Sequence, residues 1–141
     1  MDKYMDANIV FSKFSRNYME LKKDLPIRPS EMAVLNIITQ RGGSFTPLMI
    51  AELLGVSKPM IAAHIQVLLK KGYIYKEALP EDKRSFYVLP TDKALTLADK
   101  FNMKQSEHLK EIESEIGEAD FNELIRLLNK TLPILDKMKE E

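Results

Sequence analysis

The segment between residues 47 and 66 constrains the fold more than any other part of the chain. Two short helices that cross steeply through a tight turn need three kinds of residue. A small residue lies at their contact, a residue that accepts positive φ lies in the turn, and a branched apolar residue anchors the second helix. Ala51, Gly55 and Ile61 occupy these positions. The spacing therefore predicts a helix-turn-helix.

Capping residues and helix breakers predict the helices around this segment. Apolar residues at helical spacing indicate a first helix over residues 3–24, ended by Pro26, and a second helix capped by Ser30. Thr46 is expected to cap the first helix of the helix-turn-helix. Ser57 caps its second helix, which we expect to run to residue 72.

The sequence changes character after Gly72. Residues 73–78 and 85–89 are aromatic and β-branched, and a polar turn over residues 79–84 separates them, so they predict a two-stranded hairpin. Two long amphipathic helices are expected to follow, the first capped by Thr91. The second contains Pro133, which should kink or interrupt it. The predicted fold class is mainly α with a small β-hairpin wing.

Long apolar stripes lie at both ends of the chain. We expect a second copy of the chain to cover them, because a domain this small offers little other surface for them. The alternative is that these helices pack only on each other. Residues 1–28 and 91–141 are thus predicted to form a helical dimerisation region around a winged helix-turn-helix at 29–90, with interface residues Val10, Phe11, Phe121, Leu124, Leu128, Leu132 and Leu135.

The second helix of the predicted motif has an outward face suited to DNA. At 100° per residue, Ile61 and Ile65 point inward, while the outward set is small and uncharged at its centre. No carboxylate occurs between Glu52 and Glu77, which suits a surface that approaches phosphates. Ordinary helix-forming alanines on a solvated face are the alternative. The outward residues are Pro59, Ala62, Ala63, Gln66 and Lys70, with Lys58 at the free end.

The hairpin tip supplies a second expected contact. Arg84 on a projecting loop can enter a minor groove and sense its width and negative potential. We expect Asp82 to hold Arg84 by a charge-assisted hydrogen bond. A polar turn in water is the alternative for an isolated hairpin.

The motifs together resemble a known family. The helix-turn-helix, KKGYI at residues 70–74, PEDKR at 80–84 and LPTDK at 89–93 resemble the winged-helix regulators of the MarR (multiple antibiotic resistance regulator) family over nearly the whole chain. The resemblance implies a symmetric dimer that binds a pseudo-palindromic operator, usually as a repressor. The predicted DNA-binding residues are Thr46, Ser57, Lys58, Pro59, Met60, Ala63, His64, Gln66, Lys70, Asp82, Lys83 and Arg84.

The chain departs from the family pattern at three positions. Many relatives carry a hydroxyl at the position of Ala62 and an arginine at that of Ala63, where this chain offers only methyl groups. Hydrogen-bonded readout is therefore thin, which leaves Lys58, Gln66, methyl contacts and DNA shape to specify sequence. Ala94 stands where relatives often have glycine, which alters only the local turn.

The resemblance also implies a small aromatic or anionic effector that releases the DNA. Its candidate ligand-binding residues are Ser12, Arg16, Tyr18, Met32 and Asn36. Ordinary core packing beside a surface arginine is the alternative for this set. No cofactor is predicted.

The remaining classes of function find little support. The chain contains no cysteine, and its 21 basic residues balance 21 acidic ones. Thiol chemistry is thereby excluded, no enzyme motif is present, and His108 with its neighbouring glutamates is too sparse to predict a metal site. We expect a cytoplasmic protein, since no apolar run approaches the length of a membrane span. A winged-helix module for protein–protein assembly and a non-specific architectural DNA-binding protein are the alternatives.

Overall fold

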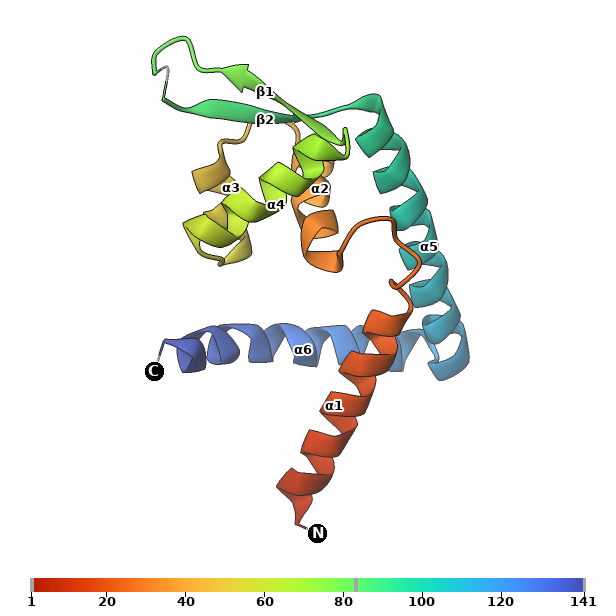
Figure 1. Ribbon diagram of the computed structural model, residues 1–141. Helices are drawn as coiled ribbons and strands as arrows, with labels where there is room; N and C mark the ends of the chain where they lie inside the picture. The colour runs from red at the N-terminus through yellow and green to blue at the C-terminus, as the bar shows by residue number, and fades with distance from the viewer. Residues whose placement is uncertain (1, 83, 141) are drawn as a thin grey trace. The chain divides into compact units, whose positions relative to one another are not determined.

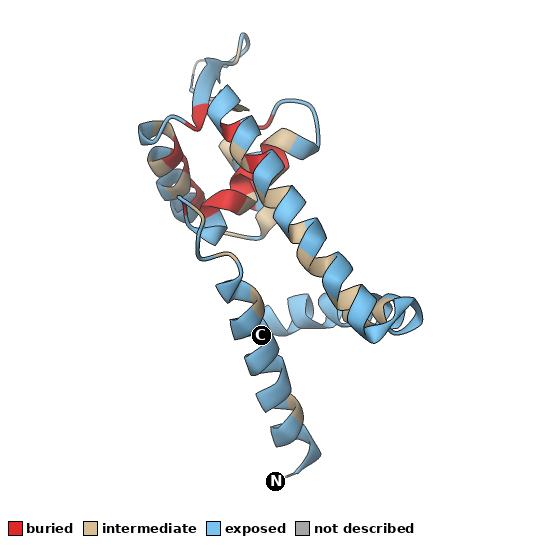
Figure 2. Cartoon of the chain, turned by 90° about the vertical axis from the view of Figure 1, so that its right-hand side faces the viewer, coloured by how far each residue is buried: buried red, intermediate tan, exposed pale blue. Residues whose placement is uncertain are grey.

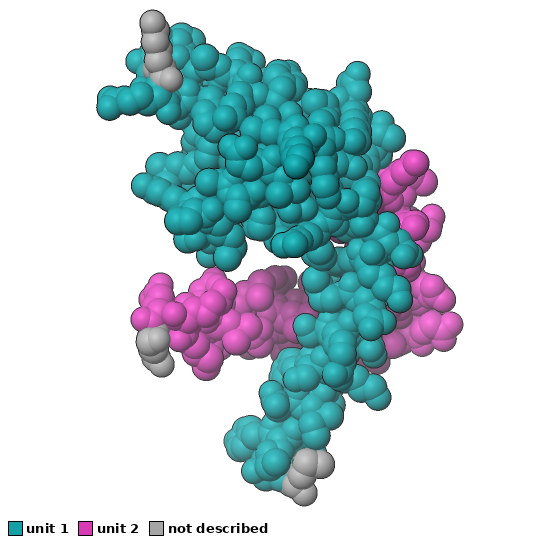
Figure 3. Space-filling model, viewed as in Figure 1, with its two compact units in different colours: residues 1–98 teal, residues 99–141 magenta. Residues whose placement is uncertain are grey.

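The computed structural model describes residues 2–82 and 84–140, and it confirms the predicted fold class (Figure 1). The chain divides into two compact units, residues 1–98 and 99–141, which are coloured separately in Figure 3. The elements in chain order are α1 (Lys3–Glu20), α2 (Pro29–Gln40), α3 (Pro47–Leu54), α4 (Lys58–Lys70), β1 (Ile74–Ala78), β2 (Phe86–Pro90), α5 (Asp92–Ile116) and α6 (Glu118–Lys139).

The core of the first unit lies among α2, α3, α4 and the hairpin. Its largest fully buried side chains come from all four of these parts, and Figure 2 shows the buried residues gathered there. Neither α1 nor α6 contains a buried residue. These largest fully buried side chains are Met32, Val34, Leu35, Ile50, Ile61, Leu68 and Val88.

The hairpin is fastened to the rest of its unit at its base and through the middle of β2. β1 and β2 pair antiparallel, with Ile74 opposite Pro90. The Val88 N–H donates to the Phe45 carbonyl at 2.8 Å, which ties β2 to the segment before α3. The Thr91 hydroxyl donates to the Gly72 carbonyl at 2.8 Å and accepts from the Ala94 N–H at 3.3 Å. The wing therefore keeps its position on α4, and Thr91 caps α5 as predicted.

Three of the predicted helix ends are wrong. The smallest difference is at α4, which ends at Lys70 rather than at residue 72. α1 ends at Glu20 rather than residue 24, because the backbone beyond it closes i to i+3 turns such as the Lys22 N–H to the Met19 carbonyl at 3.0 Å. The N-cap of α2 is Arg28 rather than Ser30. Pro29 takes the first helical position, and the Arg28 N–H donates to Glu31 Oε1 at 3.0 Å.

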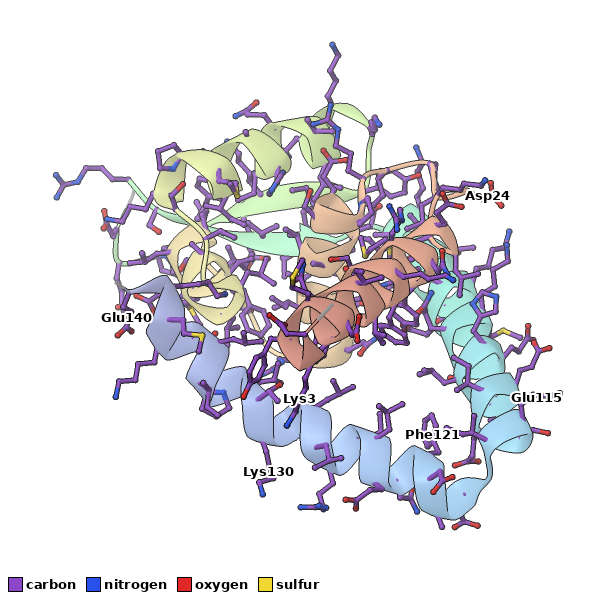
Figure 4. All side chains as sticks on the ribbon, turned by 90° about the horizontal axis from the view of Figure 1, so that it is seen from below. Lys3, Asp24, Glu115, Phe121, Lys130 and Glu140 are labelled. Carbon is purple, nitrogen blue, oxygen red and sulfur yellow. The ribbon has the colours of Figure 1, made fainter. Side chains whose placement is uncertain are left out.

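The second unit contains the remainder of α5 and all of α6. Figure 4 shows Phe121, Lys130 and Glu140 in order along α6. The helix runs through Pro133 without interruption, and the kink that was the other expected effect of this proline stays a prediction. The residues around Pro133 are exposed, and water can satisfy the carbonyl that lacks its usual N–H partner there. On the same helix, the hydrogen bond from Arg126 lowers the pKa of the Glu123 carboxyl.

The predicted division into dimerisation and DNA-binding regions stays a prediction. In the single chain, residues 1–28 group with the winged helix-turn-helix rather than with α6. No helix in the described residues is by itself long and apolar enough to cross a membrane, and the apolar pair α3 and α4 is bent by 116° at its break.

Candidate nucleic-acid interface

The turn between α3 and α4 has the geometry that its sequence predicts. The chain direction changes by 116° between the two helices, within the usual range for a helix-turn-helix. Gly55 takes the left-handed conformation at φ 67°, and its N–H and that of Val56 close the end of α3 on the Glu52 and Ala51 carbonyls. Ala51 and Ile61 are both 2% exposed. The two helices are thus fixed against each other by packing.

α4 presents one buried face and one exposed face. Ser57 Oγ accepts from the Met60 N–H at 3.2 Å and so begins the helix where expected. Ile61, Ile65 and Leu68 are buried, and His64 lies half-buried at the edge of the exposed face. The exposed residues are Lys58, Pro59, Met60, Ala62, Ala63, Gln66 and Lys70. A surface free of charge at its centre and flanked by lysines therefore faces solvent.

At the wing tip, Asp82 holds Arg84 by the charge-assisted hydrogen bond that the sequence predicts, and the donor is the backbone of the arginine. The Arg84 N–H donates to Asp82 Oδ1 at 3.0 Å, so Asp82 fixes the backbone of the arginine. The Arg84 Nε lies 3.7 Å from the same oxygen, too far for a hydrogen bond. The Arg84 side chain is 95% exposed and projects from the turn. Lys83, another predicted contact, lies outside the described residues.

A hollow of about 270 Å³ joins the helix-turn-helix to the wing. It brings together three predicted residues: Thr46 at the start of α3, Lys58 at the start of α4 and Arg84 on the wing. Two cationic side chains on separate elements thus flank one concave surface. Ala62, predicted on the outward face of α4, also lines the hollow. Prediction from the sequence missed the other lining residues, although their adjacency to predicted ones could have indicated them: Pro47, Leu48, Ile61, Ser85 and Phe86.

The predicted effector residues are spread over elements that do not pack extensively together. Ser12 and Arg16 are exposed on α1, which makes no extensive contact with the described helices and strands of its own unit. Met32 is 1% exposed in the core. Asn36 is half-buried, and its Oδ1 is enclosed without a hydrogen-bond partner. The effector pocket stays a prediction.

The predicted dimer residues form exposed or half-buried apolar surfaces. Val10 and Phe11 on α1 are 66% and 63% exposed, and Leu132 and Leu135 on α6 are 53% and 49% exposed. Phe121, Leu124 and Leu128 are half-buried within α6. No group of three or more potential metal ligands lies together in the described residues.

Comparison with known proteins finds similar sequences among transcriptional regulators. Residues 25–85 match the sequence model of the MarR family. A Bacillus subtilis protein, described as the uncharacterized HTH-type transcriptional regulator YkoM, is 29% identical over 120 residues, which cover 85% of this chain and 77% of that protein.

Solved structures share the fold over almost the full chain. The crystal structure of Streptococcus pneumoniae FabT in complex with DNA has a TM-score of 0.86 at 17% identity, covering 96% of this chain and 99% of FabT. A MarR protein from Peptoclostridium difficile has a TM-score of 0.81 at 22% identity, covering 98% and 94%. At these identities the likeness shows the fold.

Proposed function

The chain belongs to the MarR family of transcriptional regulators, and we propose that it binds a pseudo-palindromic operator as a homodimer and acts as a repressor. Membership makes it a DNA-binding transcription factor rather than an enzyme. In the proposed complex, the exposed face of α4 lies in the major groove. The wing reaches the flanking minor groove, and the protein works in the cytoplasm.

The observation that carries this proposal is the hollow between the helix-turn-helix and the wing. Lys58 and Arg84 flank it from two elements, and Thr46 adds a hydroxyl donor. Hydroxyl, ammonium and guanidinium groups are the usual ligands of phosphate oxygens in DNA complexes. A backbone phosphate between the two cations would set the register of α4 in the groove.

The exposed apolar faces of α1 and α6 support the dimer. Large apolar side chains are half or more exposed on both helices in the single chain, among them Val10, Phe11, Leu132 and Ile134. Monomeric proteins seldom expose contiguous apolar surface on this scale. Two-fold symmetry of the protein then matches two-fold symmetry of the operator.

The salt dependence of DNA binding, together with the removal of Lys58 or Arg84, distinguishes the proposed function from that of a protein–protein assembly module. Affinity for duplex DNA should fall steeply between about 50 and 200 mM salt, because phosphate contacts release counterions. Lys58→Ala and Arg84→Ala should each weaken binding and reduce the slope of log affinity against log salt by about one. Fluorescence anisotropy of a labelled duplex at several salt concentrations measures both quantities.

The matched control is Lys130→Ala on α6, which removes the same charge from an exposed position outside the interface. Its salt slope should equal that of the unmodified protein. A salt slope near zero for the unmodified protein would contradict DNA binding and favour the assembly module. If the three variants have the same slope of log affinity against log salt, the residues of the hollow do not contact DNA phosphates.

A further inference from the structure

We propose that α4 recognises A·T base pairs, with Gln66 reading an adenine and the neighbouring methyl groups reading thymines. This inference rests on the proposed function and specifies the operator chemically. It follows from the side chains that the exposed face of α4 carries and from the place of its cations.

Gln66 is the one side chain in Lys58–Lys70, all described, that pairs an amide donor with a carbonyl acceptor. It is exposed at the centre of the outward face, one helical turn beyond Ala62 and Ala63. A glutamine amide can donate to N7 of adenine and accept from its N6 amino group at the same time. Neither G·C nor the reversed A·T pair offers that pattern on the same strand. Gln66 therefore favours adenine at one position of each half-site.

Apart from Gln66, the centre of the exposed face of α4 carries apolar side chains rather than hydrogen-bonding groups. Ala62 and Ala63 present methyl groups, and the Met60 side chain is 49% exposed beside them. Apolar side chains contact the C5 methyl group of thymine, which none of the other three standard DNA bases carries. The positions next to the Gln66 adenine should therefore favour thymine.

The cations of the interface are placed away from the centre of this face. Guanine is read most often by a bidentate arginine or by lysine, but no arginine occurs between Arg41 and Arg84 in the sequence. Lys58 lines the hollow beside the wing, and Lys70 lies at the far end of α4. Both lysines are therefore assigned to phosphates, which leaves the centre of α4 without an arginine or lysine to read guanine.

The wing adds a preference of the same kind. Arg84 is 95% exposed, and its backbone is fixed by the 3.0 Å bond to Asp82 Oδ1. A-tracts narrow the minor groove and strengthen its negative potential, which attracts an inserted arginine. Both recognition elements thus select A·T pairs, α4 within the half-site and the wing in its flank.

Base analogues in the selected operator test each contact separately. Deoxyuridine removes only the thymine methyl group, and we expect about fourfold weaker binding for each contacted thymine. 7-Deazaadenine removes only N7, and at the adenine read by Gln66 it should weaken binding about tenfold. Diaminopurine in the flank adds a minor-groove amino group, and it should weaken binding by the unmodified protein but not by Arg84→Ala.

The variant Gln66→Ala identifies the side chain that reads the adenine. We expect about tenfold weaker binding, and no further loss on 7-deazaadenine, because the contact is already absent. Gln40→Ala, at the exposed end of α2, is the matched control and should bind like the unmodified protein. Deoxyuridine placed outside the DNA segment that the protein covers should not change the affinity.

The outcomes separate this inference from the proposed function. An enriched symmetric operator with the expected analogue effects supports both. The A·T readout is overturned if the enriched operator has G·C pairs at the centre of its half-sites. It is also overturned if deoxyuridine and 7-deazaadenine leave the affinity unchanged. Neither result contradicts the proposed function. Selection that enriches no sequence overturns the proposed function itself.

Discussion

Replacing Ile61 by alanine is expected to lower the free energy of unfolding by about 2–4 kcal/mol. Ile61 is 2% exposed and lies where α3 packs on α4, so alanine leaves a cavity in the contact that sets the angle of the two helices. Domains of this size are stable by only about 5–15 kcal/mol. Urea titration followed by circular dichroism measures the loss, and DNA affinity should fall with the folded fraction.

The adjacent residue Met60 provides the control. It is 49% exposed on the proposed DNA face, so Met60→Ala should change the free energy of unfolding by no more than about 0.5 kcal/mol. Its effect should appear in DNA affinity instead. If Met60→Ala destabilises the protein as much as Ile61→Ala does, the assignment of the two faces of α4 is wrong.

Replacing Phe11 by glutamate is expected to convert the protein to monomers and to weaken operator binding by about a hundredfold or more. The reason is that two linked modules gain affinity from the high effective concentration of the second module, and that gain is lost when the link is broken. Phe11 is 63% exposed in the single chain, so the glutamate leaves the core of the first unit intact. Light scattering measures the mass, and anisotropy measures the affinity.

Met103→Glu is the matched control for this prediction. Met103 is 65% exposed on α5, on the side opposite to the buried Ala94 and Ala98. The variant should remain dimeric and bind DNA like the unmodified protein. A monomeric unmodified protein that still binds an operator tightly would contradict the proposed dimer.

The local geometry of the helix-turn-helix could be predicted from the sequence because few residue types satisfy it. Gly55 meets the need for a left-handed turn, and Thr46 and Ser57 are caps whose hydroxyls accept the expected backbone N–H groups. The end of α1 and the start of α2 were less predictable. There, a proline at the first helical position and the Glu31 carboxylate replace the more common serine cap.

The candidate interface was predictable along α4 but not across elements. Periodicity separates the buried Ile61 from the exposed Gln66, since both lie on one helix. The hollow between Lys58 and Arg84 depends on how the hairpin returns over α3, through the bond from Val88 to Phe45. The dimer and effector predictions depend on a second chain or a ligand, so periodicity within one chain is only their starting point.

Selection of bound sequences from a random duplex library at roughly 150 mM salt tests the central claim most directly. A dimeric regulator with two α4 helices should enrich a two-fold symmetric site, with half-sites about one helical turn, or about 10 base pairs, apart. Salt at this level suppresses binding that depends only on phosphates. Enrichment of such a site is the expected result. A library that remains random after repeated selection, with binding lost at this salt, would contradict the account.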